Sequence, residues 1–525
     1  MGVVQIDFRI QKVFFVSADP FTHFGSDFCD QYSKAKTIRA HDWFPRSLGV
    51  IAASLAVYND WGRGACNQFE PLVDMERGGV IVPFAAKSWQ ISDDRRVFVF
   101  KIDSERRFSD GTKLTAQDFK RSWEDGLKLE AIAAQKSLMD VLYKIEGFEE
   151  FSVTGNLKGI EALDEATLKI TFNSPFRMAL DHLAGSRYAA YKIVNSQYIG
   201  TGPYRIVNAS ESFIQMEKNP YSKIPVGIEK VNIKRLDRMS AENQILNGEI
   251  DVYPGAGRTL YQGPCGEGKF GCLDGFEAAH SVLLVNGNSN RVLANPELRL
   301  ALQFIISRDY NGVSPNLIYD KYKVLPGSRD PQTFLPFQAG RLNDEEAESI
   351  IVKGEAFVAD LVTASKAHPL VLAYVKGSQQ GQAIQELLSA HHITTTEPLV
   401  CKSFLELQPL IDHESKPDLA ILSASVADGD PDGIYHALGA KGAITTPMTI
   451  RQRVSEILES GREIQDISKL DEHYKNAAVA ILEEVPWVHL GFLREKTVYR
   501  TDKIVVKQQN VKSRIREPFS IFEPK

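Results

Sequence analysis

Two pairs of residues in this sequence have types and spacing that could support chemistry. Cys265 and Cys272 lie in the glycine-rich stretch GPCGEGKFGC, whose flexible backbone would let two thiols meet, so a local disulfide is expected if the protein is exported. Zinc binding is the weaker interpretation, because no second cysteine or histidine pair has the spacing of zinc ligands. His391 and His392 are adjacent and point to different faces of a helix, which favours a solvated or capping role.

The sequence lacks the motifs of the common enzyme classes. It contains no GxGxxG or Walker-type phosphate loop, no GxSxG elbow and no HExxH motif. Carboxylates are frequent because the chain is acidic, with 61 Lys and Arg against 67 Asp and Glu and a formal charge of −6. We see no nucleophile beside a base, so we predict no catalysis, no cofactor and no metal. Nucleic acid is excluded as a partner because a phosphate footprint needs clustered positive charge.

Strand-like and helix-like runs alternate along the chain, which favours an α/β or α+β architecture. A period-2 apolar pattern predicts one strand over residues 3–16. Thr115 and Asn295 are expected to begin helices as N-cap residues. Expected strands include residues 97–101, 167–172, 231–235, 281–285, 370–375 and 419–422, and expected helices include residues 116–127, 296–306, 382–391 and 468–484.

The length of 525 residues, with 43% hydrophobic and 24% charged residues, is that of a soluble protein with two to four domains. No apolar run approaches the roughly 18 residues of a membrane helix. The N-terminus does not have the pattern of a signal peptide, since Asp7, Arg9 and Lys12 interrupt its apolar positions. Either a leader has been removed or the protein is cytosolic.

Residues 79–119 carry a long motif, and further motifs follow it in the chain. The first includes Pro83, Ala86, Trp89, Phe98, Phe100, Phe108, Ser109, Asp110, Gly111, Thr115, Ala116 and Asp118. The others are GIEALDEATLKITF (159–172), GTGPYRI (200–206), KNPYS (218–222), NQILNGEIDVYP (243–254), NPELRLALQFIISRD (295–309) and DLAILSASVADGDPDGIYHAL (418–438). Together they resemble the signature of family 5 of the extracellular solute-binding proteins of ABC transporters, the oligopeptide- and dipeptide-binding family.

This resemblance implies an α/β fold with two lobes that close over a ligand, like a periplasmic binding protein of class II, large cluster C type. A small extra subdomain would sit on the first lobe. The implied division is residues 1–36 as an N-terminal extension of unknown role, 37–70, 176–279 and 489–525 as lobe I, 71–175 as subdomain Ib, and 280–488 as lobe II.

The resemblance also implies where the ligand binds. Peptide-binding relatives hold the ligand as an added β-strand, and an Asp pairs with its α-ammonium group. That Asp aligns with Asp428, although a turn role in DGDPDG is the competing interpretation. The family Trp aligns with Ser425, which could enlarge the pocket. Candidate contacts in lobe II are Ser423, Ser425, Val426, Ala427 and Asp428, and those in lobe I are Tyr58, Asn59, Asp60 and Trp61.

Most of the motifs also have a purely structural interpretation. FSDG is a turn, because Asp and Gly tolerate left-handed backbone. Asp430 and Asp432 are expected to be turn residues, and Trp89 and residues 98–108 are expected in a core.

The implied function is capture of peptides and their delivery to the membrane subunits of an ABC permease, by a monomer at the periplasmic or extracellular face of the envelope. A sensory or regulatory protein of the same fold is the first alternative. The second is a binder of a non-peptide solute, such as a metal chelate or a sugar.

Overall fold

The computed structural model describes residues 2–8, 11–17, 67–76, 80–133, 139–195, 197–209, 213–234, 238–254, 268–310, 331–335, 338–376, 378–401, 407, 410–411, 417–426, 430–440, 450–506 and 522–524. The chain divides into two compact units. Unit 1 comprises Met1–Thr22, Ser26–Phe276 and Glu495–Lys525, and unit 2 comprises His23–Gly25 and Glu277–Arg494. Among the described residues, no helix is long and apolar enough to cross a membrane.

Unit 1 contributes one run of a large sheet, in the order β11-β12-β13-β1-β2-β14. Its strands are β1 (Gly2–Phe8), β2 (Gln11–Ser17), β11 (Tyr204–Ala209), β12 (Phe213–Lys218), β13 (Lys230–Lys234) and β14 (Val252–Pro254). The single strand expected over residues 3–16 is therefore wrong: β1 and β2 form an antiparallel pair in which Phe8 faces Gln11. Part of the expected N-terminal extension thus supplies strands to the sheet of unit 1.

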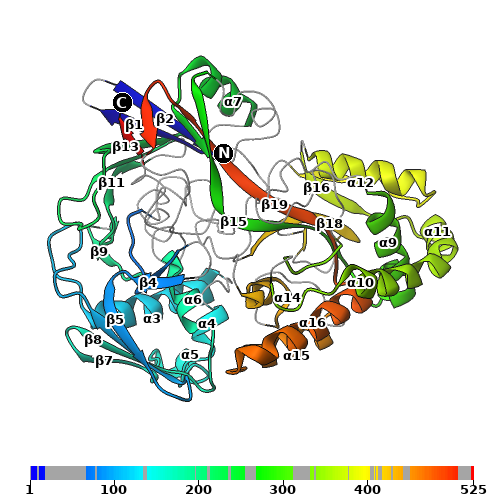
Figure 1. The fold of residues 1–525 in the computed structure, drawn as a ribbon, viewed down its shortest axis with the longest axis horizontal. Coiled ribbons are helices and arrows are strands. Elements are labelled where there is room, and N and C mark those ends of the chain that lie inside the picture. The colour runs from blue at the N-terminus through cyan, green and yellow to red at the C-terminus, as the bar shows by residue number, and fades with distance from the viewer. Residues whose placement is uncertain are drawn as a thin grey trace. The chain divides into compact units, whose positions relative to one another are not determined.

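A second sheet of unit 1 has the order β5-β6-β8-β7 and packs against helix α3 (Figure 1). Its elements are β5 (Ala86–Ile91), β6 (Val97–Ile102), β7 (Ile160–Asp164), β8 (Thr167–Thr171) and α3 (Ala116–Ala133). Phe98 and Phe100 are buried as expected, but Trp89 is only half-buried because β5 is an edge strand with mostly exposed residues. At the start of α3, the Asp118 carboxylate accepts hydrogen bonds from the backbone N–H and the hydroxyl of Thr115.

The remaining elements of unit 1 are short. They are β3 (Val73–Glu76), β4 (Val80–Pro83), α4 (Met139–Leu142), α5 (Phe151–Thr154), α6 (Ala179–Leu183), η1 (Ser186–Tyr188), β9 (Lys192–Val194), β10 (Gln197–Ile199), α7 (Arg238–Asn247), β20 (Ile504–Val506) and β21 (Phe522–Pro524).

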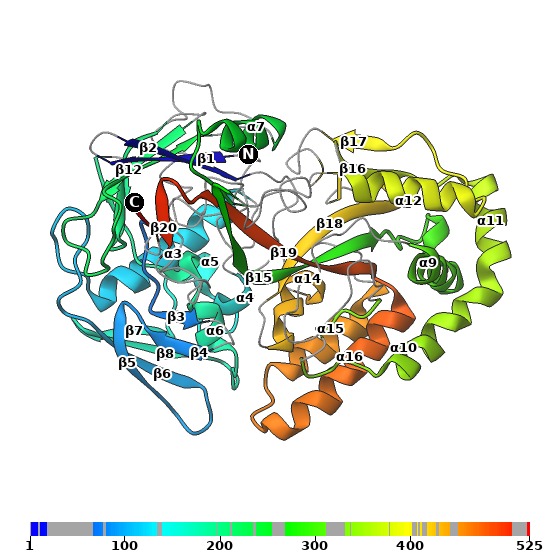
Figure 2. The ribbon, with the colours of Figure 1, turned by 45° about the horizontal axis from the view of Figure 1, so that its top comes forward.

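Unit 2 is built on strands β15 (Phe270–Val285), β18 (Leu419–Val426), β16 (Leu372–Val375) and β17 (Leu399–Cys401), in that order, with helices around them (Figure 2). The helices are η2 (Val292–Ala294), α9 (Pro296–Asp309), α10 (Asp344–Ile351), η3 (Val352–Phe357), α11 (Val358–Ala367), α12 (Gln379–Ala390), η4 (Pro431–Ile434), α14 (Tyr435–Leu438), α15 (Gln452–Gly461), η6 (Ile467–Lys469) and α16 (Leu470–Glu484). As expected, the Asn295 side chain caps α9 by accepting a hydrogen bond from the Glu297 N–H.

The chain passes between the units inside two strands, β15 and β19 (Trp487–Arg500), which are neighbours in the sheet. The unit boundaries fall between Phe276 and Glu277 in β15, and between Arg494 and Glu495 in β19. The division into lobes and a subdomain remains a prediction; residues 280–488, the expected lobe II, fall within unit 2.

Candidate ligand-binding site

Strand β18 holds the described part of the expected ligand segment. It pairs antiparallel with β15, with Ala279 opposite Ser425 and Ser281 opposite Ser423. On its other side, β18 pairs with β16 only at Leu419 and Ala420. Among the described strands, residues 421–426 therefore have a partner on one side only. Ala427 and Asp428 lie outside the described residues, and so do the four lobe I candidates at positions 58–61.

The chain that follows the expected anchor is fixed by a short helix. The Asp430 side chain caps η4 by accepting a hydrogen bond from the Asp432 N–H at 2.8 Å. Pro431 occupies the first turn of η4, where its missing N–H costs nothing. The Gln338 amide donates to the Asp430 carbonyl at 3.4 Å and accepts from the Leu335 N–H at 2.9 Å. The end of the ligand segment is therefore attached to a buried part of unit 2.

Asp432 is more than the turn residue that its sequence context suggests. Its carboxylate forms an ion pair with the Arg462 Nε at 3.2 Å, and both side chains are fully buried. The guanidinium also stacks on the Tyr435 ring, 4.0 Å from its centroid. The Tyr435 hydroxyl donates a hydrogen bond to Glu459 of α15. Arg462 carries no motif signal, so its role could be found only from the fold.

A buried histidine pair joins β15 to β19. His280 Nδ1 and His489 Nε2 lie 2.9 Å apart, and the two side chains are 2% and 4% exposed. The His280 ring centroid lies 5.8 Å from that of Trp487 and 5.0 Å from that of Phe492. Burial, with a further contribution from the charge of His489, holds the pKa of His280 well below its usual value.

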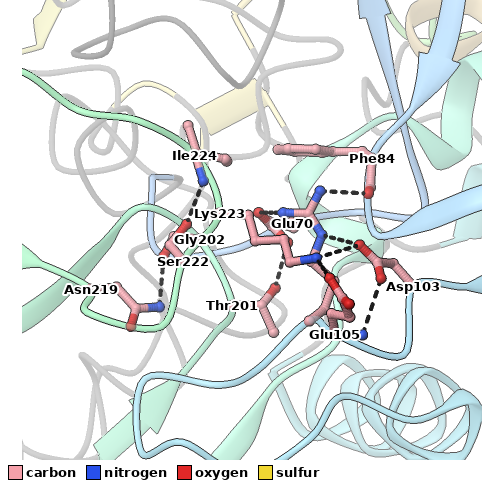
Figure 3. Close-up of polar contacts among 11 residues, drawn as sticks. Glu70, Phe84, Asp103, Glu105, Thr201, Gly202, Asn219, Ser222, Lys223 and Ile224 are labelled. Atoms are coloured by element: carbon pink, nitrogen blue, oxygen red, sulfur yellow. Dashed lines mark hydrogen bonds and ion pairs between the residues drawn. The ribbon is translucent and has the colours of Figure 1, made fainter.

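The family-like motifs of unit 1 converge on one polar network (Figure 3). Arg106 Nη1 donates to Glu70 at 3.0 Å and lies in an ion pair with Asp103. Lys223 pairs with Asp103 and Glu105. The Thr201 hydroxyl donates to the second oxygen of Glu70 at 3.1 Å. The three carboxylates of this network are each paired with Arg106 or Lys223, which indicates that the network holds loops of unit 1 together.

The GTGPY loop lies directly against the chain at positions 67–69. The Gly202 N–H donates to the Gln68 carbonyl at 2.9 Å, and the Ser109 N–H donates to the Gly200 carbonyl at 3.0 Å. The Asn219 amide, from the KNPYS motif, donates to the Gly202 carbonyl at 2.9 Å. Gly200 and Gly202 are therefore required, because the backbone of residues 67–69 lies too close to them to leave room for a side chain.

We expect Gly200→Ala to destabilise unit 1 by about 1–3 kcal/mol or more, because a new Cβ would lie 2.0 Å from the Gln68 carbonyl oxygen. The control is Gly155→Ala, whose Cβ would meet nothing closer than 3.7 Å and suffers only its left-handed φ of 63°. Urea unfolding should show the larger loss for Gly200→Ala. Equal losses would contradict the steric argument.

The described residues offer little chemistry for a metal ion. The described residues contain no group of three or more His, Cys, Asp or Glu side chains that could hold a metal ion. Cys272 is disulfide-bonded. Cys265, its expected partner, lies outside the described residues, so that pairing remains a prediction. Cys401 is buried and does not form a disulfide.

Known structures share this fold over nearly the whole chain. A periplasmic oligopeptide-binding protein of Borrelia burgdorferi, OppAIV, aligns with a TM-score of 0.75 and 19% identity, over 97% of this chain and 100% of that chain. The binding protein AgaA of A. tumefaciens R10, solved with agropinic acid, aligns with a TM-score of 0.70 and 17% identity, over 97% of this chain and 98% of that chain. The chain therefore has the two-lobe fold of the periplasmic binding proteins.

Sequence comparison then gives the family. The sequence model described as bacterial extracellular solute-binding proteins, family 5 (middle), matches residues 80–339. The periplasmic murein peptide-binding protein MppA of Escherichia coli (strain K12) is 27% identical over 213 residues, which are 37% of this chain and 39% of MppA. The match thus spans well under two thirds of that curated relative. Through residues 80–339 the chain belongs to the bacterial extracellular solute-binding proteins, family 5.

Proposed function

We propose that this protein is a non-catalytic solute-binding protein that captures peptides outside the cytoplasm and delivers them to the membrane subunits of an ABC permease. Two findings support the peptide as ligand: the family match, and relatives that include a murein peptide-binding and an oligopeptide-binding protein. The protein is expected to act as a monomer without a cofactor.

The observation that carries this proposal is the one-sided pairing of β18. Among the described strands, residues 421–426 pair with β15 but not with β16, which contacts β18 only at positions 419 and 420. The backbone N–H and C=O groups on the unpaired side can add a strand, and an extended peptide supplies one. Backbone pairing of this kind tolerates many peptide sequences, as a transporter of mixed peptides requires.

Asp428 is proposed to bind the α-ammonium group of the peptide. Asp428→Ala should weaken a peptide with a free N-terminus by roughly tenfold or more, because a charge-assisted hydrogen bond contributes about 1.5–3 kcal/mol. The same variant should leave the weaker binding of the N-acetylated peptide unchanged. Calorimetry with tri-alanine and acetyl-tri-alanine measures both.

The matched control is Asp360→Ala, at an exposed position of α11 in unit 2. It should change neither affinity. If Asp428→Ala leaves the affinity for both peptides unchanged, Asp428 is a turn residue and the anchor lies elsewhere.

Mass spectrometry of the purified protein, native and then denatured, tests the ligand class. A ladder of released short peptides is the expected result. A single non-peptide mass would overturn peptide binding and favour a specialised solute, as for the agropinic acid in the AgaA structure. An empty protein that no short peptide stabilises in a thermal-shift screen would contradict peptide capture and favour a sensory role, because ligand at 100 times its dissociation constant should add about 2.7 kcal/mol of stability.

A further inference from the structure

The start of helix α12 lies close to the strand proposed to bind the peptide. β16 runs parallel to β18 but pairs with it only at residues 419 and 420. β16 ends at Val375, and α12 begins at Gln379 and packs on β16 (Figure 2). A peptide added along residues 421–426 of β18 would therefore lie in line with β16. One of its ends would point toward the connection from β16 to α12.

Hydrogen bonds hold this connection in place. The Lys376 N–H donates to the Cys401 carbonyl at 2.7 Å. The Ser378 hydroxyl caps α12 by accepting a hydrogen bond from the Gly381 N–H at 2.9 Å. Among the described residues, the Gln380 N–H of the first turn has no acceptor. The start of α12 is thus fixed in position, and the positive end of its dipole is available to an anion.

A buried amide side chain at this helix end has donors to spare. Gln380 is 9% exposed, and its Oε1 atom accepts a hydrogen bond from the Ser281 hydroxyl at 2.9 Å. That bond fixes the amide group, whose Nε2 atom donates to no described residue. Ser281 lies directly opposite position 423 of β18, and opposite residues of an antiparallel pair share one face of the sheet. The amide therefore lies on that face, beside the strand proposed to bind the peptide.

The charges near the start of α12 also favour an anion. Three segments meet here, and they contain no Asp or Glu: residues 278–286, 371–385 and 419–426. Lys376, which is exposed, adds a positive charge. Of the nearest acids in sequence, Asp418 pairs with Arg291 and Glu386 is exposed. The segments that form this place therefore supply no anion of their own to the helix end.

We infer that the start of α12 is a carboxylate subsite, in which the Gln380 amide and the first-turn N–H groups bind a carboxylate of the ligand. This inference deepens the proposed function and rests on it for the nature of the ligand. A peptide carries carboxylates at its C-terminus and on Asp and Glu side chains. Each carboxylate accepts several hydrogen bonds, which suits an amide that lies next to free N–H groups. The subsite would add a preference for acidic groups that backbone pairing alone does not supply.

Gln380→Glu tests the subsite, because it keeps the shape of the side chain and replaces the donor by a negatively charged acceptor. The Ser281 hydroxyl can still donate to it, and an acid suits the first turn of a helix. Calorimetry compares tri-alanine with tri-alanine amide, and Ala-Glu-Ala amide with Ala-Gln-Ala amide. In the unmodified protein, at least one carboxylate peptide should bind about tenfold or more tightly than its neutral counterpart. In Gln380→Glu this preference should disappear or reverse.

The two peptide pairs identify the source of the carboxylate. Loss of the preference between tri-alanine and its amide assigns the subsite to the C-terminus, and loss of the preference between the Glu and Gln peptides assigns it to a side chain. If the unmodified protein prefers neither carboxylate, or if Gln380→Glu keeps the preference, the inference is wrong and peptide binding stands. Should Gln380→Glu not fold, Gln380→Leu replaces it, because leucine removes the donor without adding a charge.

The matched control is Gln382→Glu, which adds the same charge at an exposed position of the same helix. It should keep the carboxylate preference of the unmodified protein. An equal loss in Gln382→Glu would show that charge near the helix end, and not contact with Gln380, sets the preference. That result would overturn the assignment of Gln380.

A measurement without peptide separates this inference from the proposed function. In protein with isotope-labelled glutamine side chains, the Gln380 amide is the NMR signal that is absent from Gln380→Leu. Sodium acetate should shift this signal more than sodium chloride at the same concentration. If no peptide binds to the unmodified protein, peptide capture fails and the acetate titration decides the inference. In that case, a Gln380 signal that acetate shifts no more than chloride would overturn the carboxylate subsite.

Discussion

Arg462→Met should destabilise unit 2 by about 3–5 kcal/mol, one of the largest effects expected for any single substitution in this protein. Its guanidinium lies in a fully buried ion pair with Asp432 and stacks on the Tyr435 ring. Methionine fills much of the same volume but removes the cation of this buried pair. Removing one member of a buried pair costs more than the attraction between the two charges, because the remaining charge stays out of water.

Two comparisons make the Arg462 experiment specific. Arg453→Met removes a pair with Glu483 whose side chains are 50% and 37% exposed, so it should cost less than about 1 kcal/mol. The double variant Arg462→Met/Asp432→Leu removes both buried charges and should recover much of the stability. Urea unfolding monitored by hydrogen exchange resolves unit 2 from unit 1. A loss for Arg462→Met no larger than for Arg453→Met would refute this assignment.

Trp123→Ala should destabilise unit 1 by about 3–5 kcal/mol. Trp123 is fully buried in α3, and its ring meets Phe119 and Tyr188 edge to face. Its indole N–H donates to the Tyr188 carbonyl at 2.9 Å. Alanine would therefore open a large cavity and remove a buried hydrogen bond at once. Thermal unfolding detects the loss.

Trp89→Ala and Trp123→Phe are the matched variants for this prediction. Trp89 is half-buried on an edge strand, so its truncation should cost clearly less. Trp123→Phe keeps an aromatic ring but loses the hydrogen bond. Its loss of stability should lie between those of the two alanine variants. A larger loss of stability for Trp89→Ala than for Trp123→Ala would contradict the packing argument.

Local signals in the sequence predicted the parts of the fold that depend on local chemistry. The capping residues Thr115 and Asn295 begin helices where their side chains suggested. The division between β1 and β2 was missed because only Arg9 and Ile10 separate them, and neither is a residue that marks a hairpin turn. A period-2 pattern that continues from one strand into the next is read as a single strand.

The contacts that define unit 2 were beyond the reach of sequence patterns. Arg462 lies 30 residues from Asp432, and its neighbours in sequence are those of an ordinary helix end. His280 and His489 each occupy one position in an apolar strand, so nothing short of the strand order brings them together. Family resemblance predicted that residues 423–428 bind the ligand. The one-sided pairing of β18 could be seen only from the register of its neighbouring strands.

Unit 2 is an inserted domain, because the chain enters it in β15 and leaves it in the neighbouring strand β19. It is inserted between two parts of unit 1, and its entry at Glu277 and exit at Arg494 lie in adjacent strands. Domains whose ends are close can be excised, or given new termini by circular permutation, with a short connection between the old ends. Each unit of this protein could therefore be made as a separate polypeptide, and the folding of one could be followed without the other.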